Sequence, residues 1–112
     1  MGHDIWLTNN RGTVNSKGHI QYSMESDEYW DFTLDQLVEF DVPAFTEFIL
    51  EKSGKPQLIY IGHSQGTTQF FLANTLDEGN YGSKVKAFVG IAPVIYAGGG
   101  VTSAFIETLK MM

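Results

Sequence analysis

The chain has 112 residues, enough for one small domain, and 43% of them are hydrophobic, as in a folded globular protein rather than a disordered one. Its formal net charge of -6 argues against nucleic acid and anionic membrane as electrostatic partners. There is no cysteine, which excludes disulfides, thiolate metal sites and a cysteine nucleophile for this segment. The sequence also lacks an apolar run long enough for a transmembrane span, and we expect no signal peptide at its first residues.

The first predicted element is a short strand at residues 5–7, which ends at an Asn-Asn-Arg-Gly turn signature. Residues 13–32 are polar and mixed, so we interpret them as a long loop. Arg11 is expected to brace this loop by hydrogen bonding rather than to clamp a substrate. Trp6 and Trp30 are expected to belong to the core.

A helix is predicted from about residue 33 to residue 52. Thr33 and Gln36 have the spacing of a capping box at its start, and apolar residues then recur on one helical face. Pro43 predicts a kink or a restart within this helix. Gly54 follows it where a C-terminal cap is expected.

A Gly-x-Ser-x-Gly motif comes next, between a predicted buried strand at residues 58–61 and a predicted helix at residues 67–76. It consists of Gly62, His63, Ser64, Gln65 and Gly66. This arrangement is typical of a nucleophile elbow, whose sharp turn strains the serine backbone and exposes its hydroxyl. We therefore predict Ser64 as the nucleophile and the Gln65 N–H, at the start of the new helix, as an oxyanion donor.

The two glycines of the motif are expected because a Cβ at either position would collide across so tight a turn. The alternative interpretation is an ordinary strand–helix turn that happens to hold two glycines and a serine. Phe70 and Phe71, in the helix that follows, are expected to belong to the core.

A further strand is predicted at residues 85–92 and is stopped by Pro93, and a final helix is predicted at residues 101–112. Strands and helices thus alternate along the chain, which implies a parallel sheet with right-handed crossovers. The predicted fold class is α/β, with three parallel strands, alternating helices and an incomplete sheet.

At this point the sequence resembles the acid lipases, the relatives of lysosomal acid lipase and gastric lipase. Six blocks carry the resemblance in order: residues 2–7, 9–12, 26–32, 40–44, 62–68 and 92–94. The resemblance implies a partial α/β-hydrolase fold and a serine esterase that cleaves triacylglycerols or sterol esters at a lipid–water interface, through an acyl-enzyme on Ser64. It implies no cofactor. It suggests a lysosomal or secreted location, with the signal peptide upstream of this segment.

The remaining members of a catalytic triad are not evident in the chain. The order in this fold is Ser, then Asp or Glu, then His, yet no histidine follows Ser64, and Asp77, Glu78 and Glu107 come too early to be the triad acid. A serine without a general base is a poor nucleophile. We therefore expect residues 1–112 to be the central, elbow-bearing segment of a longer domain, inactive by itself. The alternatives are a non-catalytic pseudoenzyme that acts as an interaction module, and a serine acyltransferase.

The three histidines are assigned structural roles. His63 is expected to pack or hydrogen-bond beside the nucleophile, and His3 to be structural or exposed. His19 could approach Ser64 only as a base outside the usual order. No metal site is predicted, because Asp27, Glu28 and Asp31 lack ligand spacing and are interpreted as a solvated face.

Overall fold

The structure is a computed structural model and describes residues 2–76 and 81–95. Its elements are, in chain order, η1 (Asp27–Trp30), α1 (Leu34–Gln36), η2 (Leu37–Asp41), α2 (Val42–Ser53), β1 (Leu58–His63), α3 (Gln65–Leu76), η3 (Tyr81–Lys84) and β2 (Val85–Ile91). Of these, η1 and η3 are 3-10 turns and η2 is a π-helical turn. The helix predicted at residues 101–112 lies outside the described residues.

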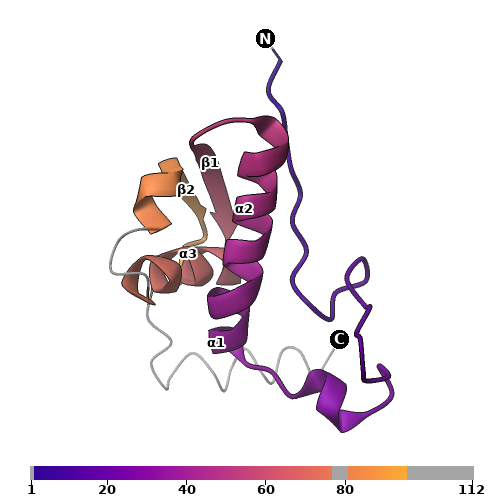
Figure 1. The fold of residues 1–112 in the computed structure, drawn as a ribbon. Coiled ribbons are helices and arrows are strands. Elements are labelled where there is room, and N and C mark those ends of the chain that lie inside the picture. Colours follow the sequence, from indigo (N-terminus) through magenta and orange to yellow (C-terminus); the bar gives the residue numbers. More distant parts are fainter. Residues whose placement is uncertain (1, 77–80, 96–112) are drawn as a thin grey trace.

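The strands β1 and β2 form a two-stranded parallel sheet that is joined through α3 (Figure 1). Aromatic rings fix α3 on one face of it. The ring of Phe70 on α3 stacks on that of Phe88 at 4.0 Å and lies 5.2 Å from that of Tyr60. The predicted α/β class, with a parallel crossover through a helix, is confirmed.

The helical layer beside α3 begins and ends as the sequence predicts. The Gln36 side chain accepts from the Thr33 N–H at 2.7 Å in a complete capping box, and Gly54 ends α2 with a left-handed φ of 64°. Pro43 has no N–H to donate and its ring crowds the preceding turn. The chain widens into η2 before α2 begins at Val42, so the predicted restart is confirmed.

The core lies between this helical layer and α3. Val38, Val42, Ala73 and Tyr81 are its buried members. The hydroxyl groups of Thr46 and Tyr81 are 2.9 Å apart within it. Because Tyr81 lies in η3, directly before β2, this contact ties α2 to the start of the second strand.

The strand predicted at residues 5–7 is not formed. Residues 2–9 run extended beside α2 (Figure 1), with the ring of Trp6 5.9 Å from that of Phe48. No backbone–backbone hydrogen bond joins this segment to the other described residues, and Ile5 and Leu7 are 79% and 88% exposed. A strand exists only through its ladder with a neighbour, so the prediction of a third strand is wrong for the described part of the chain.

The expected core positions of the two tryptophans are also wrong. Trp6 is 39% exposed and Trp30 is 48% exposed, because the ring of Phe48 covers only part of Trp6, and the rings of Tyr29 and Phe32 cover only part of Trp30. The indole N–H of Trp30 donates to the Met24 carbonyl at 2.8 Å. Phe70 and Phe71, by contrast, are half-buried in the aromatic cluster on the sheet.

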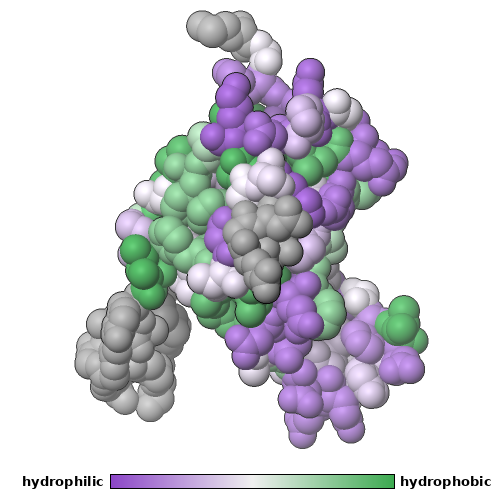
Figure 2. All heavy atoms as spheres, turned by 60° about the vertical axis from the view of Figure 1, so that its left-hand side comes forward, coloured by the Kyte–Doolittle hydropathy of each residue, from purple (hydrophilic) through white to green (hydrophobic). Residues whose placement is uncertain are grey.

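The second face of the sheet is apolar and open. Ile59 and Ile61 of β1 are 58% and 66% exposed, and Val89 and Ile91 of β2 are 46% and 51% exposed. Figure 2 shows apolar atoms gathered on the left side of the molecule in that view, with hydrophilic atoms mostly at the top and the lower right. Parallel sheets are normally covered on both faces. The sheet is therefore incomplete within the described residues, as predicted.

Candidate active site

Ser64 lies in the turn between β1 and α3 with a strained backbone. Its φ is 50°, and Ala92 is the other non-glycine among the described residues with a positive φ, at 47°. This left-handed region is costly for residues with a Cβ and is found where the surrounding structure enforces it, often at functional sites. The turn thus has the geometry of a nucleophile elbow.

Hydrogen bonds from both sides hold the Ser64 backbone. Its N–H donates to the carbonyl of Ile91, the last residue of β2, at 2.9 Å. Its carbonyl accepts from the N–H of Thr67 at 2.9 Å and from the Thr67 hydroxyl at 2.6 Å. The Ser64 side chain is partly exposed, and its Oγ has no hydrogen bond with another residue of 2–76 or 81–95. Within the described residues, the Ser64 hydroxyl is therefore accessible but is not hydrogen-bonded to a general base.

The two glycines of the motif differ in what surrounds them. A Cβ on Gly62 would lie 2.9 Å from the carbonyl carbon and oxygen of Gly66. A Cβ on Gly66 would meet no atom of the described residues within 4 Å. The predicted collision is therefore correct for Gly62 and wrong for Gly66, because the close approach is one-sided: only the Gly62 Cβ direction points at the opposing backbone.

The N-terminus of α3 offers an unpaired donor next to Ser64. Gln65 is the first residue of this 12-residue helix, and its N–H has no acceptor among the described residues. Unpaired amides at a helix N-terminus, together with the helix dipole, favour negative charge. The arrangement can receive an oxyanion that forms on a carbonyl attacked by Ser64.

Two threonines in the first turn of α3 contact the segment after β2, and sequence analysis did not assign them a role. The Thr67 hydroxyl accepts from the Val94 N–H at 2.9 Å, and the Thr68 hydroxyl donates to the Val94 carbonyl at 2.7 Å. Hydroxyl residues near helix starts commonly bond to backbone groups, which is the signal that could have drawn attention to them.

No histidine ring makes a hydrogen bond with Ser64 in the described structure. Nδ1 of His19 accepts from the N–H groups of Gln21 and Tyr22 at 3.1 and 2.9 Å, so this ring organises its own loop. His63 is exposed, and no hydrogen bond of its ring to another described residue is found. His63 pairs in register with Ile91, and its structural role beside Ser64 stays a prediction. His3 is exposed.

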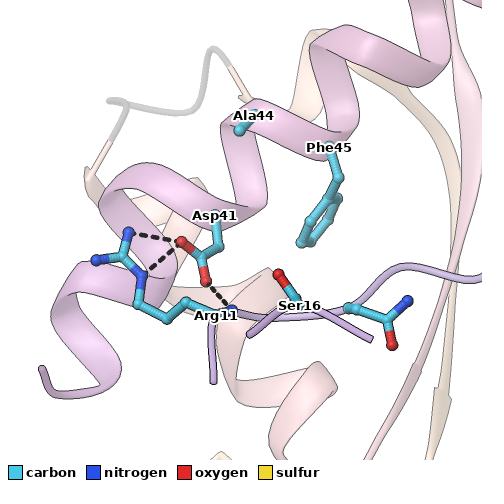
Figure 3. A pocket seen from close by; sticks show the side chains of 6 residues that line it. Arg11, Ser16, Asp41, Ala44 and Phe45 are labelled. Carbon is cyan, nitrogen blue, oxygen red and sulfur yellow. Dashed lines mark hydrogen bonds and ion pairs between the residues drawn. The ribbon is translucent and has the colours of Figure 1, made fainter. Parts of the chain in front are cut away.

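Arg11 braces the N-terminal loop against the helical layer, as predicted. Its backbone N–H donates to one carboxylate oxygen of Asp41 at 2.8 Å, and its Nε and a terminal nitrogen donate to the other at 2.8 and 2.6 Å (Figure 3). The guanidinium lies 5.7 Å from the ring centre of Phe40. The pair borders a shallow pocket lined by Asn9, Arg11, Ser16, Asp41, Ala44 and Phe45.

The described residues contain neither a metal-binding cluster nor a membrane-spanning helix. In residues 2–76 and 81–95 there is no group of three or more His, Asp or Glu side chains placed to hold a metal ion. The helices there are too short and too polar for any of them to cross a membrane. The acids Asp27, Glu28 and Asp31 are exposed on and after η1.

Comparison of the sequence with known proteins identifies the family of this chain. The family model of the alpha/beta hydrolase fold matches residues 1–111. Human lipase member K is 45% identical over 94 residues, which cover 84% of this chain and 23% of the relative. Bovine gastric triacylglycerol lipase is 42% identical over 93 residues, covering 83% of this chain and 23% of the relative.

A third relative, from Crotalus adamanteus and named as a lysosomal acid lipase/cholesteryl ester hydrolase, is 42% identical over 104 residues, which cover 89% of this chain and 26% of the relative. The chain thus spans about a quarter of the length of the curated relatives that it matches. The shared stretch includes the strand, the strained serine and the helix described above. The chain belongs to the alpha/beta hydrolase fold family, in a segment that it shares with the acid lipases.

Proposed function

We propose that this chain is the elbow-bearing segment of a serine hydrolase that cleaves the carboxylic esters of lipids, such as triacylglycerols or sterol esters. The single observation that carries the proposal is Ser64, with a φ of 50° between β1 and α3, next to the unpaired Gln65 N–H. The names of the relatives, which include gastric triacylglycerol lipase and lysosomal acid lipase/cholesteryl ester hydrolase, support the substrate class.

In the proposed reaction, Ser64 Oγ forms a bond to the ester carbonyl carbon and gives its proton to a general base. The carbonyl oxygen becomes an oxyanion and accepts from the Gln65 N–H, and a second donor completes the oxyanion hole. Collapse of this intermediate breaks the bond to the alcohol, which leaves with the proton. Water then attacks the acyl-enzyme, releases the fatty acid and restores Ser64.

The base and the triad acid are proposed to come from polypeptide outside these 112 residues. No histidine follows Ser64 in the sequence, and the curated relatives are about four times as long as the matched segment. Residues 1–112 are on this view the central part of one hydrolase domain. The lysosomal or secretory location suggested by the relatives' names is part of the same proposal, and fractionation of expressing cells would test it.

The first test uses a fluorophosphonate probe, which reacts only with an activated serine. The full gene product that contains this segment is expected to be labelled, and Ser64→Ala is expected to abolish labelling and to lower ester turnover by about 10⁶-fold. Ser23→Ala, in the exposed N-terminal loop, is the matched control. This variant is expected to keep both the labelling and the ester turnover of the wild type. Labelling that survives in Ser64→Ala contradicts the assignment of the nucleophile.

The second test concerns substrate and reaction. Emulsified triolein and cholesteryl oleate are offered with and without an added long-chain alcohol, and the products are separated. Release of free fatty acid supports the hydrolase. Transfer of the acyl group to the alcohol in preference to water identifies an acyltransferase instead, and no turnover by a folded, full-length protein identifies a pseudoenzyme.

A further inference from the structure

Two sharp backbone turns lie side by side at the catalytic edge of the sheet. His63 and Ile91 are the last paired residues of β1 and β2, so Ser64 and Ala92 occupy the next position on each strand. Both have left-handed backbones, with φ of 50° and 47°. Neither residue is a glycine, so the surrounding structure must hold both conformations in place. The elbow is therefore a pair of neighbouring turns.

One buried hydroxyl connects the two turns. The side chain of Thr67 is fully buried, at 0% exposure. Its Oγ1 donates to the carbonyl of Ser64 at 2.6 Å and accepts from the N–H of Val94 at 2.9 Å. We call this connection the Thr67 bridge. A hydroxyl has one proton to donate and lone pairs to accept with, so the two bonds use the group in both directions.

A second, more exposed hydroxyl, that of Thr68, also bonds to the turn at Ala92. Thr68 Oγ1 donates to the carbonyl of Val94 at 2.7 Å. Val94 is thus bonded through both its N–H and its carbonyl to adjacent residues of the helix that follows the nucleophile. The Ser64 carbonyl and the turn at Ala92 are thus connected through the side chains of the first turn of α3, in addition to the backbone bond from the Ser64 N–H to the Ile91 carbonyl.

We propose that Thr67 is a positioning residue for the nucleophile. Its hydroxyl holds the Ser64 carbonyl and the turn at Ala92 in a fixed relation, and thereby sets the direction of Ser64 Oγ and of the Gln65 N–H. The inference rests on the proposed function, because it concerns how Ser64 is held for attack. Thr67 itself does not touch the reacting atoms, so its effect belongs in kcat and in the labelling rate rather than in KM.

The test compares Thr67→Val with Thr67→Ser in the full gene product. Valine keeps the shape of the side chain and removes both hydrogen bonds, whereas serine keeps the hydroxyl and loses a methyl group. Thr67→Val is expected to lower kcat on a soluble ester, and the rate of fluorophosphonate labelling, by about tenfold, the scale of one or two hydrogen bonds. KM is expected to change by less than about twofold, and Thr67→Ser is expected to restore both rates.

The controls separate this inference from the proposed function. If Ser64→Ala abolishes labelling but a folded Thr67→Val is labelled at the wild-type rate, the Thr67 bridge has no positioning role and the nucleophile assignment stands. If Ser64→Ala is still labelled, the proposed function is wrong, and the inference about Thr67 falls with it. Thr67→Ser as slow as Thr67→Val also overturns the inference.

Thr68→Val provides a second variant in case Thr67→Val does not fold. Thr68 is only partly buried, and its hydroxyl makes one bond to Val94 and none to Ser64. This variant is expected to slow labelling by about threefold, less than a buried pair of bonds would. A wild-type labelling rate in Thr68→Val overturns the proposed coupling between the turn at Val94 and Ser64.

Discussion

The elbow region, from β1 to the turn after β2, and the N-terminal segment, residues 2–32, start from similar sequence patterns and end in different states. Both begin with a short apolar run followed by a turn signature. In the elbow region the run becomes a strand paired with β2 in a parallel ladder. In the N-terminal segment the run stays extended, and Leu7 is 88% exposed. An apolar run encodes extended backbone, and only a neighbouring edge turns it into a strand.

The two regions are also held by different contacts. The elbow region is held by backbone bonds, such as that from Ser64 N–H to the Ile91 carbonyl, and by the stacked rings of Phe70 and Phe88. The N-terminal segment is held by side chains, above all by the bonds of Arg11 to Asp41. Changes in the elbow region are therefore expected to affect fold and catalysis together. Changes in the N-terminal segment are expected to loosen that segment without altering the labelling of Ser64.

The largest effect is expected from the two glycines of the elbow, compared as a matched pair. Gly62→Ala places a Cβ 2.9 Å from the Gly66 backbone, and relief of such a contact costs roughly 1–3 kcal/mol and displaces Ser64. Gly66→Ala enters open space within a helix, where alanine is favoured over glycine by up to about 1 kcal/mol.

Thermal melting and fluorophosphonate labelling of the full gene product would measure both effects. We expect Gly62→Ala to lower the melting temperature and to lose labelling, and Gly66→Ala to keep both. An equal loss of melting temperature and labelling in the two variants would contradict the close contact at Gly62 and the open space at Gly66.

A smaller effect is expected from the contact that holds the N-terminal segment. Arg11→Lys keeps the charge but cannot reproduce the two guanidinium bonds that converge on Asp41 Oδ1. Since the Arg11 side chain is 37% exposed, the loss is expected to be about 1 kcal/mol, at the low end for bonds to charged groups. Limited proteolysis should then cut residues 13–26 faster, with Ser64 labelling unchanged. Loss of labelling in step with proteolysis would mean that the two regions are coupled.

An effect of similar size at neutral pH is expected from Tyr60, whose hydroxyl donates to the Gly66 carbonyl at 3.1 Å. Tyr60→Phe removes one partly buried bond, worth about 1 kcal/mol. Burial, with a smaller contribution from the nearby Tyr81, raises the pKa of Tyr60 from 10.0 to about 12. A raised pKa means that the folded chain keeps a proton that the unfolded chain loses, so this contribution is complete below pH 10 and disappears toward pH 12.

The measurement is the free energy of unfolding in urea between pH 9 and pH 12, followed by circular dichroism. The wild-type chain is expected to lose stability over this range, and Tyr60→Phe is expected to lose less. Tyr22→Phe, at an exposed tyrosine of the N-terminal segment, is the control and should follow the wild type. Parallel curves for the wild type and Tyr60→Phe would contradict the pKa shift.

Much of the fold could be predicted because its signals are local. The capping box at Thr33 and Gln36, the glycine cap at Gly54 and the restart of the helix at Pro43 each depend on residues a few positions apart. The tryptophans could not be placed in the same way. Their hydrophobicity predicts burial, but burial requires neighbours that enclose the whole ring. The contacts of Trp6 with Phe48 and of Trp30 with Tyr29 and Phe32 leave both rings partly exposed in the described structure.

What the sequence by itself determined is the local pattern: a strand, a Gly-x-Ser-x-Gly turn and a helix, with Ser64 at the sharp turn between them. What only the tertiary structure decided is which residues hold that turn and its surroundings. The Thr67 bridge joins residues 27 positions apart, and Arg11 and Asp41 are separated by 30. Such pairs carry no local pattern, because their partners meet only after β1, α3 and β2 have packed.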